Sequence, residues 1–583
     1  MAPSIGAMSA YLDPALCANP CGQGGAIELC ANNAVNACSG CQIVQYCSKE
    51  CQKKHWPLHK VTCKSELMKT SWKPEWHRNH RIPVFISDRT PLAMFGTKKY
   101  LWGNMPALDI LNLKDNEGDT DLNRDLALLF AASGDPRNIF KTVAGLPIGC
   151  KSRCHVTVND MDFDIVARNA IMLLIALHYE PEEAVPMIIH FWYSALLPAM
   201  MVQSLQANVL PLIEDVCGKI ASKASDALQA KTFTIRGRTL RLVLKKQEWL
   251  RLGTYFDVPE GLSAGDADSL RREVTLAPSR VDYRDRAMLN WTPTLRQCEE
   301  RFRMTGILLP YGCSQGPDFD TPNPLRRLTK HRTFFQEKDW PMMDSACPRE
   351  GWDCAEYTKH APIAKADTYG ALFFMLRDLL LRFCERVHKV KISFELFCIN
   401  AVNIGNHTGT RRFDRIEISN ICDRGYIGPQ ACFMAFSPLL KDKSANSKAS
   451  MLMLFLNAVK EIDHTSSDTV SKQLRMSMAM NRTRKYLPIH KYTPPTSYGD
   501  PDLIRRTSCL DALTDYSGVF ETFLRDELIA EGARANGLKI KDKHTIVEPW
   551  PYKVGMRATK KEFDILVAGS TSGYERYMEV EKL

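Results

Sequence analysis

The stretch from residue 38 to residue 63, CSGCQIVQYCSKECQKKHWPLHKVTC, concentrates five cysteines and two histidines in 26 residues. Its metal-binding residues fall into three pairs, namely Cys38 with Cys41, Cys47 with Cys51, and His59 with Cys63. A Cys-x2-Cys pair presents two thiolates to one metal ion from a tight turn, and residues four apart share one face of a helix. Because tetrahedral zinc takes two such pairs per ion, three pairs predict a fourth pair elsewhere in the chain.

The fourth pair is expected upstream, where Cys17, Cys21 and Cys30 supply three candidates for two places. Four pairs make two tetrahedral sites, so the sequence predicts two zinc ions. The alternative is a cluster of buried or disulfide-bonded cysteines. Disulfides need an oxidising compartment, and the opening MAPSIGAMSAYLDPALC lacks the basic start and continuous apolar core of a signal peptide.

The spacing and the residues between the ligands resemble the MYND-type zinc finger, on the motifs Tyr46-Cys47-Ser48, Cys51-Gln52, Trp56 and His59-x3-Cys63. In that family the first and third pairs hold one zinc ion, and the second and fourth pairs hold the other. The resemblance implies two ligand sets: Cys17, Cys21, Cys47 and Cys51 for site one, and Cys38, Cys41, His59 and Cys63 for site two. The pair Cys17-x3-Cys21 is one residue wider than the usual first pair, and Cys30 could replace either member.

His55 is a further histidine that could be mistaken for a ligand. It is four residues from both Cys51 and His59, so one unbroken helix would align all three side chains. Pro57 disfavours helical geometry at Trp56 and begins a new turn well, which predicts a break at this point. We therefore expect His55 to be a surface residue.

Length and composition indicate an ordinary reduced, multidomain protein. A chain of 583 residues suggests about three to four units, and 45% hydrophobic with 24% charged residues is typical of soluble proteins. Twelve of the 20 cysteines are scattered after residue 63, which favours reduced thiols in the cytoplasm or nucleus. The most apolar runs, 170–177 and 187–201, are too short or too polar for membrane spans, so no membrane partner is expected.

The order of elements between residues 125 and 177 is that of a βαβ unit. An apolar strand at 126–132 ends in the turn SGDPRN, a helix at 139–146 follows, and a strand at 154–158 ends at Asn159-Asp160 before a helix at 165–177. In Rossmann-like folds the first turn approaches a nucleotide, and an acid after the second strand holds its ribose. Gly134, Asp135 and Asp160 are therefore candidate cofactor-binding residues. A dinucleotide fingerprint has more glycines and Asp135 can simply cap a helix, so a purely structural unit is the interpretation that we favour over a bound nucleotide or S-adenosylmethionine.

Three segments extend this interpretation: WGNMPALDILNL, LLFAASGDPRNIFKTVAGL and VNDMDFDIVARNAIMLLIAL. They resemble an uncharacterised domain that follows MYND fingers in many fungal proteins and is related to the N-terminal domain of dynein axonemal assembly factor 3. The resemblance covers residues 101–177 and implies a Rossmann-like, methyltransferase-like core, for which S-adenosylmethionine is the possible cofactor. No catalytic acid, base or nucleophile constellation can be recognised in the sequence.

The expected fold class is multidomain α/β, with a two-zinc finger and a Rossmann-like core that carries a large helical insertion. The expected units are the finger at 13–66, a linker at 67–100, the Rossmann-like domain with a helical section at 101–300, a Pro-rich connecting segment at 301–366, a second α/β and helical portion at 367–540, and a C-terminal segment at 541–583. We further expect an amphipathic segment at 239–252 in a helix-rich region, a helix at 369–387, strands at 392–400 and 413–423, a last helix at 510–530 and a short C-terminal tail. Ser419–Asp423 should lie at the carboxyl edge of the sheet, where ligands bind, although we favour the alternative of a buried strand followed by an Asx-type turn.

Three functions are consistent with these features. The first is an interaction protein, because MYND fingers characteristically bind short proline-containing peptides in a groove, which by resemblance Gln52 and Trp56 would line. The second is an S-adenosylmethionine-dependent methyltransferase-like enzyme. The third is a transcriptional regulator, suggested by a net charge of +10 and by lysines around the finger, although no base-reading helix can be identified. We adopt the first, a scaffold or regulatory factor, and assign no catalytic residue.

Overall fold

The centre of the protein is one nine-stranded mixed sheet, in the order β12-β13-β11-β10-β3-β4-β9-β7-β6. The computed structural model describes residues 8–20, 30, 32–90, 94–118, 124–313, 316–324, 340–488, 499–569 and 571–583. The strands of the sheet are β3 Leu126–Phe130, β4 Cys154–Asp160, β6 Leu228–Ile235, β7 Arg238–Lys245, β9 Ile392–Cys398, β10 Arg415–Glu417, β11 Ser450–Phe455, β12 Leu538–Ile540 and β13 Arg576–Lys582. Strands from the two expected α/β portions therefore share one sheet.

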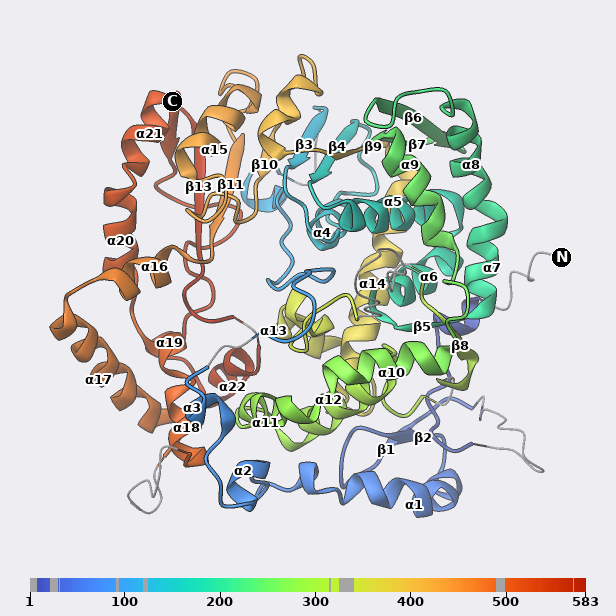
Figure 1. The fold of residues 1–583 in the computed structure, drawn as a ribbon, viewed down its shortest axis with the longest axis vertical. Coiled ribbons are helices and arrows are strands. Elements are labelled where there is room, and N and C mark those ends of the chain that lie inside the picture. Colours follow the sequence, from blue (N-terminus) through green and yellow to red (C-terminus); the bar gives the residue numbers. More distant parts are fainter. Residues whose placement is uncertain are drawn as a thin grey trace.

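Helices surround this sheet and extend away from it (Figure 1). Those packed near the sheet are α4 Arg137–Ala144, α5 Phe163–His178, α6 Pro181–Tyr193, α9 Lys246–Gly253, α14 Thr368–Lys389, α15 Pro429–Phe436, α16 Ala458–Thr465, α20 Ser517–Asp526 and α21 Ile529–Ala535. The others are α1 Lys49–Cys63, α2 Glu75–Arg78, α3 Val84–Ser87, α7 Ala199–Asn208, α8 Leu210–Lys219, α10 Ala264–Thr275, α11 Val281–Met288, α12 Pro293–Thr305, α13 Cys354–Tyr357, α17 Thr469–Tyr486, α18 Pro501–Thr507, α19 Leu510–Leu513 and α22 Lys560–Ala568. Within the described part of the chain, no helix combines the length and apolar character needed to span a bilayer.

The order of the strands reverses beside β3. The pairs from β11 across to β7 are parallel, whereas β13 and β6 run antiparallel to their neighbours. The strands that follow β3 in sequence, β4 and β9, lie on one side of it, and the later strands β10 and β11 lie on the other. In open α/β sheets such a reversal leaves a crevice outside the carboxyl ends of the strands.

Both faces of the sheet are covered. Along β3, Leu128 and Phe130 join a hydrophobic cluster with α4, α5, α6 and α14, whereas Ala127 and Leu129 join a cluster with α15, α16, α20 and α21. Successive side chains of a strand point to opposite faces, so the unbroken apolar run LALLF is explained by burial on both sides. The predicted βαβ order is confirmed as β3, α4, β4 and α5, and the helix at 369–387 and the strand at 392–400 are confirmed as α14 and β9.

The expected amphipathic segment at 239–252 divides into a strand and a helix. β7 occupies its first half and pairs with β6 as an antiparallel hairpin at the edge of the sheet, before α9 begins. The turn between the two strands places Arg236 at φ +50° and Gly237 at φ +83°. Two consecutive positive φ angles are typical of the tight type I′ hairpin turn, which an X-Gly pair between alternating strands can signal.

Two expectations for the last quarter of the chain are wrong. The single helix expected at 510–530 is divided into α19, α20 and the start of α21. The expected C-terminal tail is instead β13, which pairs with β11 on one side and β12 on the other. The strand expected at 413–423 is shorter than predicted, since only β10 is extended.

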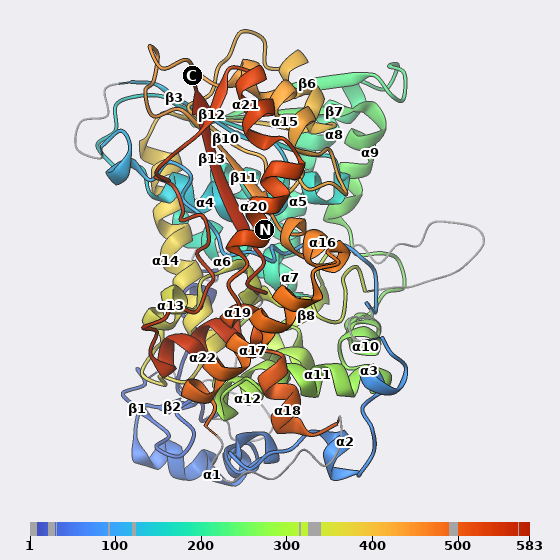
Figure 2. The same cartoon turned by 90° about the vertical axis from the view of Figure 1, so that its left-hand side faces the viewer.

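The zinc finger region lies at the opposite end of the molecule from the sheet, with α10–α12 between them (Figures 1 and 2). It contains α1 and a small ribbon of β1 Asn36–Ala37 and β2 Gln45–Tyr46. Its residues Ile43, Val44 and Tyr46 are buried in the same hydrophobic cluster as one face of the sheet. The Ala366 N–H donates to the Gln42 carbonyl oxygen at 2.9 Å, so the finger is docked on the body of the protein.

The connector after the finger is also held against the body. Trp76 is fully buried with Phe85 and Ile504, and its indole Nε1–H donates to the Gly499 carbonyl oxygen at 2.9 Å. The Arg296 guanidinium lies 4.7 Å from the ring centroid of Trp72. These contacts give both tryptophans a packing role.

Candidate metal centre

Helix α1 carries Cys51 of the first predicted metal site and both His59 and Cys63 of the second, whereas Cys47 lies two residues before the helix begins. Ser48 is its N-cap, and the Ser48 hydroxyl accepts a hydrogen bond from the Cys51 N–H at 3.2 Å. Pro57 lies inside α1, so the predicted break is wrong and the helix continues to Cys63. Lys53 and Pro57 are both exposed, so the carbonyl group that loses its helical donor at the proline is on the solvent side.

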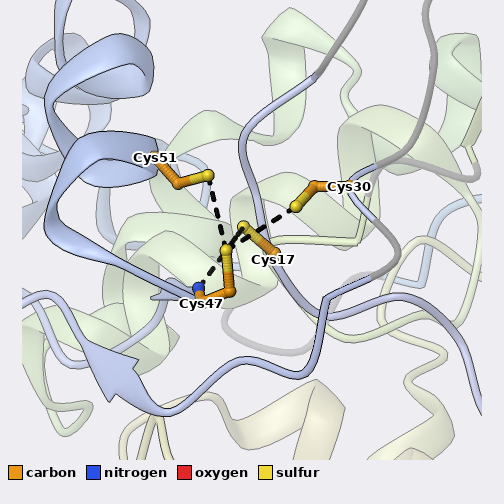
Figure 3. A group of neighbouring side chains, drawn as sticks. All are labelled: Cys17, Cys30, Cys47 and Cys51. Atoms are coloured by element: carbon orange, nitrogen blue, oxygen red, sulfur yellow. Dashed lines mark hydrogen bonds between the residues drawn. The ribbon is translucent and has the colours of Figure 1, made fainter.

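Four cysteine side chains converge in the first cluster: Cys17, Cys30, Cys47 and Cys51 (Figure 3). The Cys47 Sγ lies 3.7 Å from the Cys17 Sγ, 3.6 Å from that of Cys30 and 3.4 Å from that of Cys51. Four sulfur atoms in a tetrahedron around zinc, each about 2.3 Å from the ion, are about 3.8 Å apart. The cluster therefore fits one zinc ion.

The second cluster consists of Cys38, Cys41, His59 and Cys63, with all four ligand atoms within 4.8 Å of one another. The Cys38 and Cys63 sulfur atoms are 3.9 Å apart, and the Cys41 Sγ lies 3.4 Å from the His59 Nε2. A Cys3His set is a common structural zinc site. Two zinc ions are thus accommodated by the two clusters.

Backbone pairing and hydrogen bonds fix Cys17 beside α1. The Ala18 N–H donates to the Gln45 carbonyl oxygen at 3.0 Å, which holds the N-terminal segment along β2. The Cys47 N–H donates to the Cys17 Sγ at 3.5 Å, and the Asn19 Nδ2 donates to the Cys51 Sγ at 3.5 Å. Such donors around the sulfur atoms orient metal ligands and stabilise thiolates.

The protonation states of the second cluster suit metal binding. Burial lowers the pKa of His59 to about 4, so its ring is neutral at pH 7, which is the form that ligates metal. Burial raises the pKa of Cys41 to about 12, so this thiol is protonated unless a cation compensates the thiolate charge. A zinc ion supplies that charge and deprotonates the thiol on binding.

Seven of the eight predicted zinc ligands lie in the two clusters. The second cluster has the same four residues as the predicted site two. In the first cluster Cys17, Cys47 and Cys51 come together with Cys30, which the sequence left as an alternative, and Cys21 lies outside the described residues. His55 lies in neither cluster, but it is half-buried rather than a surface residue as expected, because its ring packs beside Tyr46 and its Nδ1 lies 3.0 Å from the Tyr46 hydroxyl.

Helix α1 carries exposed apolar and positively charged side chains. Trp56, Leu58 and Val61 on α1 are exposed by 36%, 66% and 71%, and Gln52 lies one turn before Trp56. The ring of Trp56 meets that of His59 edge to face, at 5.8 Å between centroids. Five exposed lysines surround this surface: Lys49, Lys53, Lys54, Lys60 and Lys64.

A cleft of about 790 Å³ opens at the carboxyl edge of the sheet, where the strand order reverses. The ends of five parallel strands supply lining residues: Ser133, Asp160, Asn400, Asn420 and Asn457. The three candidate cofactor-binding residues, Gly134, Asp135 and Asp160, all line this cleft. The segment around Asn420 also lies at this edge, as the sequence predicts.

Hydrogen bonds explain how the candidate residues are held. Gly134 has φ +54°, which favours glycine, and its N–H donates to the Asp160 Oδ2 at 2.9 Å. Burial raises the pKa of Asp160, while hydrogen bonds from the backbone N–H groups of Asp162 and Gly134 oppose the rise. Asp135 accepts from the Gly103 N–H at 2.8 Å and pairs with Arg137, and its side chain does not cap α4.

Glu350 is a lining residue that the sequence did not single out. It follows an irregular stretch within the expected Pro-rich segment, where neither helical nor strand periodicity marks a side chain as important. Burial raises the pKa of Glu350 to about 8. Among the described residues, no hydrogen bond or ion pair is made by its carboxyl group.

Comparison with known proteins gives matches in the finger and in the first part of the α/β structure. A family model described as the MYND finger matches residues 20–63, and one described as a domain of unknown function (DUF4470) matches residues 101–197. Dynein axonemal assembly factor 3 of Danio rerio is 37% identical over 76 residues, which cover 13% of this chain and 15% of that protein. The SET domain and MYND-type zinc finger protein 6 of Schizosaccharomyces pombe is 57% identical over 28 residues, which cover 5% of this chain and 6% of that protein.

These similarities are local. The chain spans less than a sixth of the length of either curated relative, and no solved structure matches it significantly. Cys17 lies three residues before the finger match, yet its sulfur atom belongs to the first cluster. The chain carries a MYND zinc finger near its N-terminus, followed by a DUF4470 domain within a larger α/β structure.

Proposed function

We propose that this chain is a zinc-binding scaffold or regulatory factor that captures a protein partner through the outer face of its finger. The observation that carries this proposal is the division of the finger into two faces. Ile43, Val44 and Tyr46 are buried in the hydrophobic cluster that the finger shares with the body, whereas Trp56, Leu58 and Val61 are exposed on α1. An exposed apolar surface on a rigid support is typical of an interaction site.

The partner segment is a proline-containing peptide with acidic residues beside the proline. An exposed tryptophan offers a flat apolar wall to a proline ring, and Gln52 can hydrogen-bond the peptide backbone. The five surrounding lysines outnumber the one acid of α1, Glu50, so acidic flanks give charge complementarity and faster association.

The proposal also covers the organisation of the core and the cellular compartment. The parallel strands on either side of β3 and the reversal of their order support a Rossmann-like organisation of the core. No disulfide joins the described cysteines, which supports a reducing compartment such as the cytoplasm or nucleus.

A direct test measures fluorescence polarisation of a proline-containing acidic peptide library with the full-length, zinc-loaded protein. Trp56→Ala should weaken the binding of the tightest peptide by about 1–3 kcal/mol, or roughly 5- to 150-fold in Kd, because an anchoring aromatic side chain is removed. The matched control is Leu250→Ala, which truncates a side chain that is 49% exposed on α9, far from the finger in sequence.

Equal peptide affinity in wild type and Trp56→Ala would show that the groove lies elsewhere. If the library shows no binding and the protein instead binds duplex DNA with a steep salt dependence, the regulator interpretation replaces the proposal.

A further inference from the structure

The cleft at the carboxyl edge of the sheet has the position and size of a small-molecule site. Its volume of about 790 Å³ lies within the range of about 300–1,000 Å³ that is usual for ligand pockets. It lies at the reversal of strand order, where open α/β sheets bind their ligands. The inference does not depend on the finger's function, because none of the residues that line the cleft belongs to the finger.

The charged groups of the described lining disfavour a phosphate-bearing ligand. Among the residues that the structure describes, four acids and two bases line the cleft: Asp135, Asp160, Glu350, Glu575, Lys99 and Arg137. Arg137 pairs with Asp135 and donates its Nε–H to the Met105 carbonyl oxygen at 2.8 Å. Lys99 pairs with Asp162 at 3.4 Å and also with Asp164. Both cations are therefore already neutralised by acids, and the excess of acids would repel phosphate.

The turn after β3 points to the same conclusion. In dinucleotide-binding sheets the backbone N–H groups of this turn face the pyrophosphate. Here the Gly134 N–H donates to the Asp160 carboxylate at 2.9 Å, so this donor is already used. The Asp160 Oδ2 atom occupies the place where a phosphate oxygen would otherwise accept that bond.

The polar groups around Asp160 suit a ligand with hydroxyl groups. Asp160 Oδ2 accepts from the Gly134 N–H at 2.9 Å and Oδ1 accepts from the Asp162 N–H at 2.9 Å, and the Met161 N–H also interacts with this carboxyl group. A carboxylate has about four lone-pair sites, so Asp160 retains an acceptor for a sugar hydroxyl. Met161 and Ile165 line the cleft next to Asp160 and provide an apolar wall for a heteroaromatic ring.

Glu350 adds a second, independent indication. Glu350 lines the cleft, and among the described residues none donates a hydrogen bond to its carboxyl group or forms an ion pair with it. The residue is half-buried at an open cleft, so a bound ligand can supply a partner for this carboxyl group. A cationic group is the partner that stabilises its ionised form.

We propose that this cleft binds a nucleoside that carries a positive charge and no phosphate, the chemical class of S-adenosylmethionine. Asp160 accepts from the ribose hydroxyls, and Glu350 faces the cationic part of the ligand. The proposal concerns binding, and the residues of the cleft are assigned positioning roles only.

The test is calorimetric titration of the full-length, zinc-loaded protein at pH 8 with S-adenosylmethionine, its neutral analogue S-adenosylhomocysteine, ATP and NAD. We expect S-adenosylmethionine to bind most tightly and the two phosphate-bearing ligands to bind at least about tenfold more weakly. Asp160→Asn should weaken the binding of both adenosyl ligands by about tenfold, because the variant removes a charged hydrogen-bond acceptor for the ribose that both ligands contain.

Glu350→Gln separates a charge contact from a merely structural role. This variant should weaken the binding of S-adenosylmethionine by about tenfold and change the affinity for S-adenosylhomocysteine by less than about twofold, because only S-adenosylmethionine is cationic. The matched control is Asp226→Asn, an exposed acid outside the cleft lining, which should change neither affinity. Thermal unfolding of each variant verifies that it is folded.

Two results would overturn the proposal. One is the absence of binding by every adenosine-containing ligand to the folded wild-type protein. The other is tighter binding of ATP or NAD than of S-adenosylmethionine, which would show that the cleft accepts phosphate. If Glu350→Gln lowers the affinity for both adenosyl ligands equally, Glu350 does not bind the positive charge of the ligand.

Discussion

Burial of acidic groups is a feature of both the finger and the cleft. In the first cluster of the finger, the Cys47 sulfur atom lies 3.4 to 3.7 Å from three other cysteine sulfur atoms, and four thiolates at that spacing require a cation. In the cleft, the Glu350 carboxyl group makes no ion pair among the described residues. The same physical cause, removal of an anion from water, raises the pKa of Cys41 and of Glu350.

Glu350 should make the stability of the folded protein depend on pH. Burial raises its pKa from 4.5 to about 8, with Glu299 acting in the same direction and Arg349 and Arg303 acting against it. The folded state therefore holds this proton more tightly than the unfolded state, and its stability falls as pH rises from about 4.5 through 8. Glu350→Gln cannot ionise and should remove this loss.

We expect Glu350→Gln to match wild type in urea unfolding at pH 4.5 and to be more stable by about 1–2 kcal/mol at pH 9, a reduced figure because the carboxyl group borders an open cleft. A difference between the two proteins that does not change with pH would contradict this account. Asp226→Asn, with an exposed carboxyl group, should follow wild type at every pH.

Residue spacing identified most of the metal site and only part of the cleft. Cys38, Cys41, His59 and Cys63 could be grouped because the members of each pair lie close together in sequence. The choice among Cys17, Cys21 and Cys30 could not be made, because it depends on the path of the chain between them. Glu350 could not be found, since it reaches the cleft only through tertiary packing.

At the scale of elements, helix α1 and the β6–β7 hairpin show two ways in which local signals are overridden or missed. Pro57 predicts a helix break, yet its position on the solvent side of α1 lets the helix continue. The hairpin was hidden in a region with abundant helical periodicity. β13 was missed because its charged residues suggest an exposed tail, whereas Glu579 is fully buried and accepts from the Lys541 Nζ at 2.7 Å.

The hairpin turn provides a test of the edge strand. Gly237 has φ +83°, so Gly237→Ala should destabilise the protein by about 1 kcal/mol, even though an added Cβ would meet no atom within 4 Å. Gly218 in α8 has equally open surroundings and no positive φ, so Gly218→Ala should be neutral or stabilising by up to about 1 kcal/mol. Urea unfolding of the two variants compares them, and equal effects would contradict the assigned turn.

At the scale of the whole molecule, strands that lie far apart in the chain form one sheet, from β3 near residue 126 to β13 near residue 582. The finger is docked at the far end through the Ala366–Gln42 hydrogen bond of 2.9 Å and the burial of Tyr46. A partner held on the outer face of α1 would therefore have a fixed position relative to the body. Local periodicity could predict the individual strands, but the single sheet required long-range pairing that no local pattern encodes.

The central claim is that two zinc ions fold the finger, one of them held by Cys30. Native mass spectrometry of the intact protein tests it most directly, because each bound zinc ion adds a resolvable mass. We expect two zinc ions in wild type and in Cys21→Ser, and one in Cys30→Ser and in His59→Ala, since each of the last two loses a ligand atom of one cluster. One zinc ion or none in undamaged wild-type protein, or a loss in Cys21→Ser that Cys30→Ser does not show, would contradict the account.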